Sequence, residues 1–260
     1  MKFIRFTAGQ ETEIRTGVLE NNSVREISGD MFGDWEYTGT NFPGDEVTLK
    51  APLEPNQVIG IGANFVASKD DLPDELPEIP VFFYKPVSSV IGPETPIEIP
   101  AALEEVKFES ELAVVIGKEA KNVDEKDVED YIFGYTVGND VTAPQYFHKD
   151  GHWTVGKSFD TFTPLGPVIE TELDPAEVKV ESSLNGEKKQ DSHVSLMIVP
   201  MANMVSYLSK VMTLKPGDVI LTGSPLGAEF LKDGDRIECT IEGIGTLANN
   251  TQKAKDKVSV

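Results

Sequence analysis

The chain has 260 residues, of which 39% are hydrophobic, and its formal net charge is −21 at pH 7. This size allows a substantial buried core, while the acidic balance repels nucleic acid and anionic membranes. A single cysteine, Cys239, excludes an intrachain disulfide and fits a reducing compartment. The start lacks the apolar segment of a signal peptide, and no stretch is long enough to span a membrane. We therefore expect a cytoplasmic protein with neither nucleic-acid nor membrane partners.

The first informative element is a predicted strand that begins with two glutamates. Glu109 and Glu111 are separated by one residue and precede the apolar run Leu112 to Ile116. Because side chains alternate along a strand, both carboxylates point the same way, roughly 7 Å apart. Two buried like charges raise each other's pKa unless a cation or hydrogen-bond donors compensate them. A divalent cation is the simplest compensation, although a solvated edge strand would show the same spacing.

A third carboxylate follows in a second strand-like run. A helix with Asp124 as its N-cap, ending near Tyr131, is predicted to separate the two strands. The second run, at residues 133–142, ends in small polar residues and carries Asp140. Together with the two glutamates this makes an oxygen-only ligand set. Such a set suits Mg²⁺ or Mn²⁺, with Ca²⁺ as a possible substitute, rather than Zn²⁺.

The later part of the chain predicts one helix and two strands. The helix spans roughly residues 201–212, where apolar residues recur at helical spacing. These residues are Met201, Met204, Val205, Leu208, Val211 and Met212. We interpret the methionines as core residues rather than as part of a cofactor site. The strands are predicted at Asp218 to Thr222 and at Arg236 to Ile241.

Several motifs follow one another in a fixed order along the chain. They are Phe82 to Pro86, Phe108 to Gly117, Asn139 to Ala143, Gly156 to Phe162 and Leu214 to Gly227. This order resembles the fumarylacetoacetate hydrolase superfamily, in particular its branch of 2-hydroxyhepta-2,4-diene-1,7-dioate isomerases and acylpyruvate hydrolases. The resemblance implies an α+β, mostly β fold with a mixed β-sheet roll. It further implies a small N-terminal domain at residues 1–55, a catalytic domain at 56–260, and a homodimer.

The resemblance also implies roles for individual residues. In the family, the two glutamates and the later aspartate hold Mg²⁺ or Mn²⁺, a lysine lies in the active site, and a Thr-Gly-Thr-Pro loop binds the substrate carboxylate. The matching residues are Glu109, Glu111 and Asp140 for the metal, Lys157 for the lysine, and Thr222, Gly223 and Ser224 for the loop. The metal would chelate a small 2-oxo or enol acid and stabilise its enolate.

Two positions depart from the family pattern. Many hydrolytic members activate water with a histidine and a glutamate on a lid helix, where this chain has Ser68 and Asp71. A serine without a partner is not a general base near neutral pH, so this chain lacks the usual dyad, and Asp71 is the carboxylate candidate that it keeps. The family arginine after the metal-binding aspartate is Pro144 here. His148 and His152 are candidates for the missing base, although two solvent-exposed loop histidines would look the same.

The sequence therefore predicts a divalent-metal-dependent enzyme acting on a small 2-oxo or enol dicarboxylic acid. The reaction is either hydrolysis of a C–C bond or isomerisation of a 2-hydroxydienoate. Decarboxylation or tautomerisation of an oxaloacetate-type acid, and dehydration of a 2-keto-3-deoxy sugar acid, use the same chelated enolate and stay open. A non-catalytic scaffold that keeps only the metal site is the alternative from another class.

Overall fold

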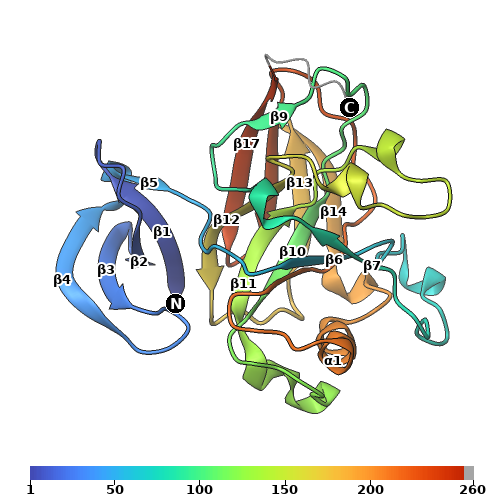
Figure 1. Ribbon diagram of the computed structural model, residues 1–260, viewed down its shortest axis with the longest axis horizontal. Helices are drawn as coiled ribbons and strands as arrows, with labels where there is room; N and C mark the ends of the chain where they lie inside the picture. Colours follow the sequence, from blue (N-terminus) through green and yellow to red (C-terminus); the bar gives the residue numbers. More distant parts are fainter. Residues whose placement is uncertain (255–260) are drawn as a thin grey trace.

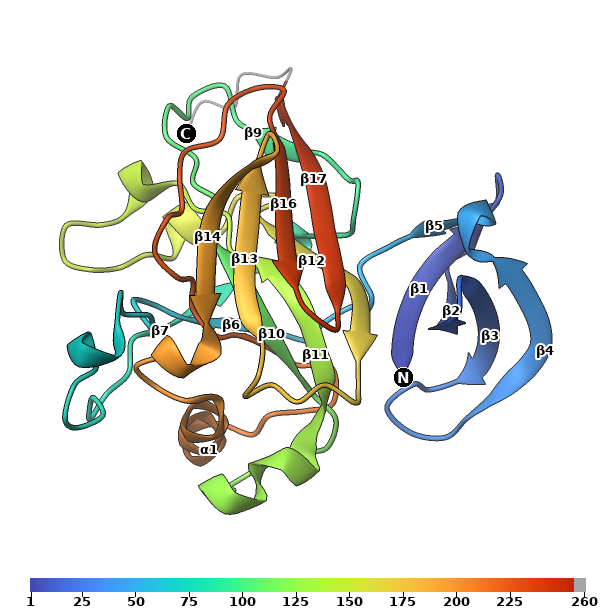
Figure 2. The same cartoon turned by 180° about the vertical axis from the view of Figure 1, so that it is seen from behind.

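The structure is a computed structural model that describes residues 1–254. Figures 1 and 2 show a small lobe of curved N-terminal strands beside a larger body built from two sheets. The N-terminal strands are β1 (Lys2–Ala8), β2 (Arg15–Glu20), β3 (Ser23–Gly29), β4 (Trp35–Pro43) and β5 (Val47–Leu49). This arrangement confirms the predicted mostly β roll with a small N-terminal domain.

The larger sheet of the body continues from the N-terminal strands. Its remaining strands are β6 (Val58–Ile61), β7 (Phe82–Lys85), β8 (Val90–Ile91), β10 (Ser110–Ile116), β11 (Ile132–Asn139), β12 (Thr163–Glu170) and β15 (Val219–Leu221). The strand order is β4-β3-β2-β1-β12-β11-β10-β15-β6-β7, with β5 paired to β1 and β8 paired to β12. Most neighbours run antiparallel, but β15 pairs with β6 in parallel, so the sheet is mixed as predicted.

The second sheet covers the body on its other side (Figure 2). Its strands are β9 (Ile97–Ile99), β13 (Lys179–Leu184), β14 (Glu187–His193), β16 (Arg236–Ile241) and β17 (Gly245–Lys253), in the order β14-β13-β16-β17-β9. The predicted strand from Arg236 to Ile241 is confirmed, and the one predicted from Asp218 to Thr222 forms as the slightly shorter β15.

Both faces of the central strand β10 are buried. Leu112, Val114 and Ile116 belong to the large core cluster, which includes side chains from both sheets. Ala113 and Val115 belong to a smaller cluster with residues of β1, β2 and β3 on the other face. A strand that is buried on both faces has apolar residues at successive positions, which explains the apolar run from Leu112 to Ile116 in β10. Its two glutamates therefore lie at the end of a fully buried strand rather than on a solvated edge strand.

The α-helix α1 (Met201–Val211) confirms the predicted helix. Met204 is completely buried, while Met201 and Met212 are half-buried against the large core, in agreement with their interpretation as core residues. Val211, expected on the same apolar face, is instead 64% exposed. Val211 is the last residue of the helix, and its side chain is exposed although the next residue, Met212, still packs against the core.

The segment after Asp124 forms a short helix of a different type. Residues Glu125–Tyr131 adopt a 3₁₀-helix, and the Asp124 side chain makes no capping hydrogen bond to it. The neighbouring Val123 is fixed to α1, because its N–H donates to Ser209 Oγ and its C=O accepts from Ser206 Oγ. Further 3₁₀-helices lie at residues Gly44–Glu46, Lys69–Asp71, Val87–Ser89, Pro144–Tyr146, Val155–Lys157 and Val194–Leu196.

The division of the chain at residues 55 and 56 stays a prediction. In the structure, β1 joins the larger body by pairing Lys2 with Glu170 and Phe3 with Ile169 of β12. The last six residues of the predicted 56–260 domain lie outside the described residues. Within residues 1–254, no helix has the length and apolar character needed to cross a bilayer.

Candidate active site

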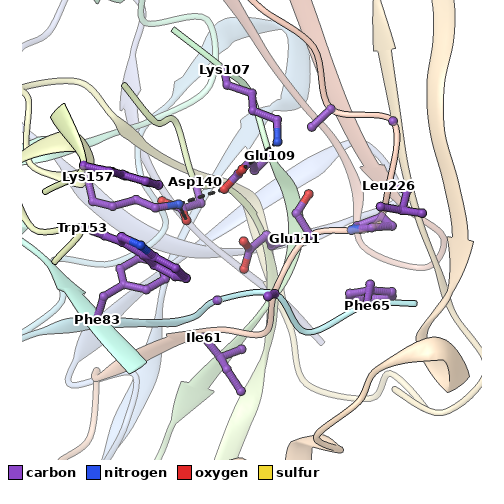
Figure 3. Close-up of a pocket in the computed structure, with 17 residues that line it drawn as sticks. Ile61, Phe65, Phe83, Lys107, Glu109, Glu111, Asp140, Trp153, Lys157 and Leu226 are labelled. Atoms are coloured by element: carbon purple, nitrogen blue, oxygen red, sulfur yellow. Dashed lines mark hydrogen bonds and ion pairs between the residues drawn. The ribbon is translucent and has the colours of Figure 1, made fainter. Parts of the chain in front are cut away.

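Antiparallel pairing of β10 with β11 brings the three predicted carboxylates together. Ser110 pairs with Asn139, so the residues that flank this pair, Glu109 and Asp140, lie side by side just beyond the ladder. The Asp140 N–H donates to the Glu109 carbonyl oxygen at 2.8 Å. Glu111 points the same way as Glu109, and one carboxylate oxygen from each of the three residues lies within 4.8 Å of the others (Figure 3).

Two of these carboxylates are removed from water. Glu111 and Asp140 are each 1% exposed, whereas Glu109 is half-buried. Burial raises the pKa of Glu111 well above its usual value, and the negative charge of Asp140 raises it further. The Glu111 carboxylate accepts one hydrogen bond, from the Gly223 N–H at 2.7 Å, and no lysine or arginine of residues 1–254 forms an ion pair with it. This buried carboxylate is therefore open to a cation.

Two buried lysines compensate Asp140 and Glu109. Lys157 Nζ donates to Asp140 Oδ2 and, at 2.8 Å, to Glu109 Oε2. Lys85 Nζ donates to Asp140 Oδ1 at 2.5 Å and to the Val141 carbonyl oxygen at 3.0 Å. Lys157 also lies over the ring of Phe83, with Nζ 4.6 Å from the centroid. The two ammonium groups hold Asp140 between them.

Burial and charge act in opposite directions on this cluster. Burial alone would raise the pKa of Asp140, but Lys157 and Lys85 lower it overall. Burial alone would lower the pKa of Lys157, but Asp140 and Glu109 raise it overall, so this side chain stays an ammonium ion. For Lys85, burial dominates and its pKa is lowered, because the attraction of Asp140 is opposed by Lys157. The two lysines differ because Lys157 bonds two carboxylates and Lys85 only one.

The donor set fits a hard divalent cation. Three carboxylates that converge within 4.8 Å offer oxygen ligands only, as Mg²⁺ and Mn²⁺ prefer. Glu111 gives the same indication, because burial and then the charge of Asp140 raise its pKa, and a divalent cation beside it would favour its ionised form.

The carboxylates open into a cavity of about 450 Å³. One wall is aromatic, with Phe83, Phe147 and Trp153 in contact: the Phe147 and Trp153 rings are stacked at 5.4 Å, and Phe83 meets Trp153 edge-on at 5.8 Å. Gly62 makes this wall possible, since a Cβ there would lie 1.9 Å from a Trp153 ring atom. The opposite side carries Leu226 and Lys107 (Figure 3).

The residues of the predicted substrate loop do not all lie at the cavity. Ser224 lines the cavity, whereas the Thr222 hydroxyl is buried and donates to the Leu112 carbonyl oxygen at 2.8 Å. The Gly223 N–H is engaged by Glu111. Gln190 holds the loop in place, because its Nε2 donates to Ser224 Oγ at 2.8 Å and to the Pro225 carbonyl oxygen at 2.7 Å. Substrate binding by Thr222, Gly223 and Ser224 stays a prediction.

The structure does not bring three other candidates, Asp71, His148 and His152, to the cavity. Ser68 and Asp71 are exposed and bond to each other, with Ser68 Oγ 2.8 Å from Asp71 Oδ2, at the start of a 3₁₀ turn. His148 and His152 are also exposed and line a separate surface pocket with Val155. The predicted roles of Asp71, His148 and His152 as acid or base stay predictions, and none of the three lines the cavity.

Sequence reasoning missed Lys85, Lys107 and Gln190 as parts of the site. Lys85 had a usable signal, because a lysine at the end of the apolar strand β7 needs a buried partner, as the glutamates of β10 do. Lys107 also had a signal, because it lies two residues before Glu109 and the alternation that relates Glu109 to Glu111 extends to it. Gln190 lies in a polar stretch, and no local pattern marks it.

Comparison with known proteins agrees with this geometry. Residues 57–252 match the family model "Fumarylacetoacetate (FAA) hydrolase C-terminal", and residues 1–52 match the model "Rv2993c-like, N-terminal". The chain belongs to the fumarylacetoacetate hydrolase family. Protein Rv2993c of Mycobacterium tuberculosis is 44% identical over 87% of each chain. The crystal structure of 5-carboxymethyl-2-hydroxymuconate delta-isomerase from Mycobacterium smegmatis matches with a TM-score of 0.90 and 40% identity, over 98% of this chain and all of that one.

Two further relatives carry more specific names. The mitochondrial oxaloacetate tautomerase fahd2 of Xenopus laevis is 40% identical, over 78% of this chain and 68% of its own length. Maleylpyruvate hydrolase from Sphingobium sp. SYK-6, in complex with manganese(II) and pyruvate, matches with a TM-score of 0.82 and 29% identity, over 98% of this chain and all of that one. The family thus includes isomerases, tautomerases and hydrolases. This chain is an enzyme of that family.

Proposed function

We propose that the protein is a divalent-metal-dependent isomerase or tautomerase of a small 2-oxo or enol dicarboxylic acid. The observation that carries this proposal is the carboxylate triad of Glu109, Glu111 and Asp140, with Lys157 beside it at the floor of the cavity. The triad would hold Mg²⁺ or Mn²⁺. When bound there, such a cation supplies Lewis-acid activation of the vicinal oxygens of a 2-oxo acid.

Lys157 supplies the charge that the reaction needs. Interconversion of keto and enol forms moves a proton between carbon and oxygen and passes through an enolate. Lys157 stays protonated because Asp140 and Glu109 raise its pKa. A buried ammonium ion stabilises the negative enolate oxygen more strongly than a solvated one, since little water competes with it. Lys85 keeps Asp140 ionised from the opposite side.

The groups around the cavity favour isomerisation over hydrolysis. Hydrolysis needs a base that activates water, and no histidine is among the residues that line this cavity in the described part of the chain. Ser68 and Asp71, at the positions of the family dyad, bond to each other at the surface. Enolate chemistry needs no activated water. The names of the M. smegmatis isomerase and the X. laevis tautomerase support the same choice.

Chromatographic separation of the products followed by mass analysis tests the reaction class, since an isomer changes its elution but not its mass. The purified enzyme would be incubated with Mg²⁺ or Mn²⁺ and a panel of oxaloacetate, 2-hydroxymuconate-type dienoates, acylpyruvates and 2-keto-3-deoxy acids. Isomerisation leaves the mass unchanged, hydrolysis yields two fragments, decarboxylation removes CO₂ and dehydration removes water. We expect conversion at constant mass, and Glu111→Gln as the control should show none. Cleavage of an acylpyruvate as the fastest reaction would overturn the proposal in favour of a hydrolase.

We further propose that the enzyme is a homodimer, as the family resemblance implies. Light scattering at moderate salt should then report twice the chain mass of 28.4 kDa. A strict monomer across micromolar concentrations would contradict this.

A further inference from the structure

The cavity carries a lysine for which the proposed chemistry has no use. Lys107 and Lys157 both line the cavity, and Lys85 lies behind Asp140. Lys157 and Lys85 are 3% and 2% exposed, and each directs two hydrogen bonds at buried acceptors. Neither has an ammonium group free to meet the far end of a substrate.

Lys107 has a fixed backbone and an ammonium group with a single ion-pair partner, Glu109. Its N–H donates to the Thr142 carbonyl oxygen at 2.7 Å, and its own carbonyl oxygen accepts from the Thr142 N–H at 2.9 Å. On the other side it forms a β-bridge with Phe230. The side chain is 34% exposed and lies 3.3 Å from Glu109 Oε1, beyond the usual length of a strong charged hydrogen bond. The ammonium group lines the cavity beside Glu109, and with this one partner it keeps donors to spare (Figure 3).

The charge balance also favours an anionic ligand. With a divalent cation in the triad, this cation, Lys157 and Lys107 outweigh the three carboxylates. None of the chain's four arginines contributes to the cavity. Arg5 pairs with Glu54, Arg15 with Glu11, Glu13 and Glu26, Arg25 with Glu20, and Arg236 with Glu94. Lys107 is thus the cation left to bind a second carboxylate.

We propose that Lys107 is a specificity-determining residue that binds the distal carboxylate of a 2-oxo dicarboxylic acid. The inference rests on the proposed function, in which the 2-oxo acid end of the substrate lies at the triad. Lys107 then selects dicarboxylates over 2-oxo acids that end in an apolar or esterified group. An apolar or esterified end leaves the Lys107 ammonium group without this second carboxylate partner, which lowers the affinity for such a substrate.

Two matched pairs of ligands test the role of Lys107. Turnover is compared for oxaloacetate and its 4-methyl ester, which differ in the distal charge. Binding is compared by calorimetry for 2-oxoglutarate and 2-oxopentanoate, in which a methyl group replaces the distal carboxylate. The variants are Lys107→Met, Lys107→Arg and, as a charge-matched control, Lys210→Met on the exposed face of α1. Mg²⁺ binding by each variant, measured separately, shows that the fold and triad are intact.

We expect the wild type to prefer the dicarboxylate of each pair. Lys107→Met should lower kcat/KM for oxaloacetate by about 10- to 100-fold, mainly through KM, and affect the ester by less than about threefold. Lys107→Arg should restore much of the preference, and Lys210→Met should leave it unchanged.

An equal loss for both members of each pair would overturn the inference, because a structural role of Lys107 predicts that outcome. A wild type without preference for the dicarboxylates would overturn it as well. If turnover is absent but calorimetry shows a preference that Lys107→Met abolishes, the proposed reaction fails while the inference about Lys107 stands.

Discussion

Lys85 Nζ lies 2.5 Å from Asp140 Oδ1, and both side chains are buried. Removing one partner of a buried ion pair leaves an uncompensated charge. Lys85→Met should therefore lower the free energy of unfolding by roughly 3 kcal/mol, the lower end of such losses, since Asp140 keeps Lys157. Urea denaturation in the presence of EDTA measures this without a contribution from metal. A loss below about 0.5 kcal/mol would show that the pair contributes little to folding.

Glu111→Gln should abolish tight metal binding. The substitution keeps the shape of the side chain and its hydrogen bond from Gly223, but removes the negative charge that faces the cation site. Titration calorimetry with Mn²⁺ should show affinity reduced by more than about 100-fold, since even outer-shell changes at metal sites cost 10- to 100-fold. Glu177→Gln, at an exposed position away from the cavity, is the matched control. Unchanged Mn²⁺ binding by Glu111→Gln would contradict the proposal that the carboxylate triad binds the metal.

Lys157→Met should abolish turnover with the metal still bound, because the enolate charge loses its ammonium partner. Ser68→Ala should cost less than about twofold, since Ser68 bonds to Asp71 at the surface and does not line the cavity. Steady-state kinetics of both variants, with Mn²⁺ affinity measured in parallel, separate chemistry from folding. If the two substitutions were equally damaging, the segment around Ser68 would take part directly, and hydrolysis would become the better assignment.

Burial raises the pKa of the Cys239 thiol to about 12, against an ordinary value near 9. The folded state thus favours the protonated thiol. Its contribution to stability is fully present below pH 9 and is lost as the pH rises from about 9 toward 12. Over this range the unfolding free energy of the wild type should fall more steeply than that of Cys239→Val, and parallel curves would contradict the assignment.

At pH 8 the native Cys239 thiol should resist a disulfide reagent that reacts with it fully in urea.

The sequence was sufficient to predict the triad but not the surroundings of the triad. A period of two within an apolar run fixes the common direction of Glu109 and Glu111, and strand pairing then brings Asp140 to them. The contacts of Lys85 and Gln190 depend on strands distant in sequence, whose neighbours no local pattern reveals.

The segment from Asp124 to Tyr131 shows a second limit of local patterns. A favourable cap residue is compatible with either helix type, and contacts with α1 accompany the 3₁₀ form. Gly223 is a third case. The motif predicts a loop that faces substrate, but its N–H is already bonded to the neighbouring carboxylate of Glu111.

The ketonisation rate of enol-oxaloacetate, followed by absorbance with and without Mg²⁺, tests the central claim most directly. The account predicts rapid catalysis with Mg²⁺, loss of catalysis in EDTA, recovery when Mg²⁺ is restored, and no catalysis by Glu111→Gln under any of these conditions. Catalysis that persists in EDTA and in Glu111→Gln would contradict the claim that a metal held by the carboxylate triad drives enolate chemistry in this enzyme.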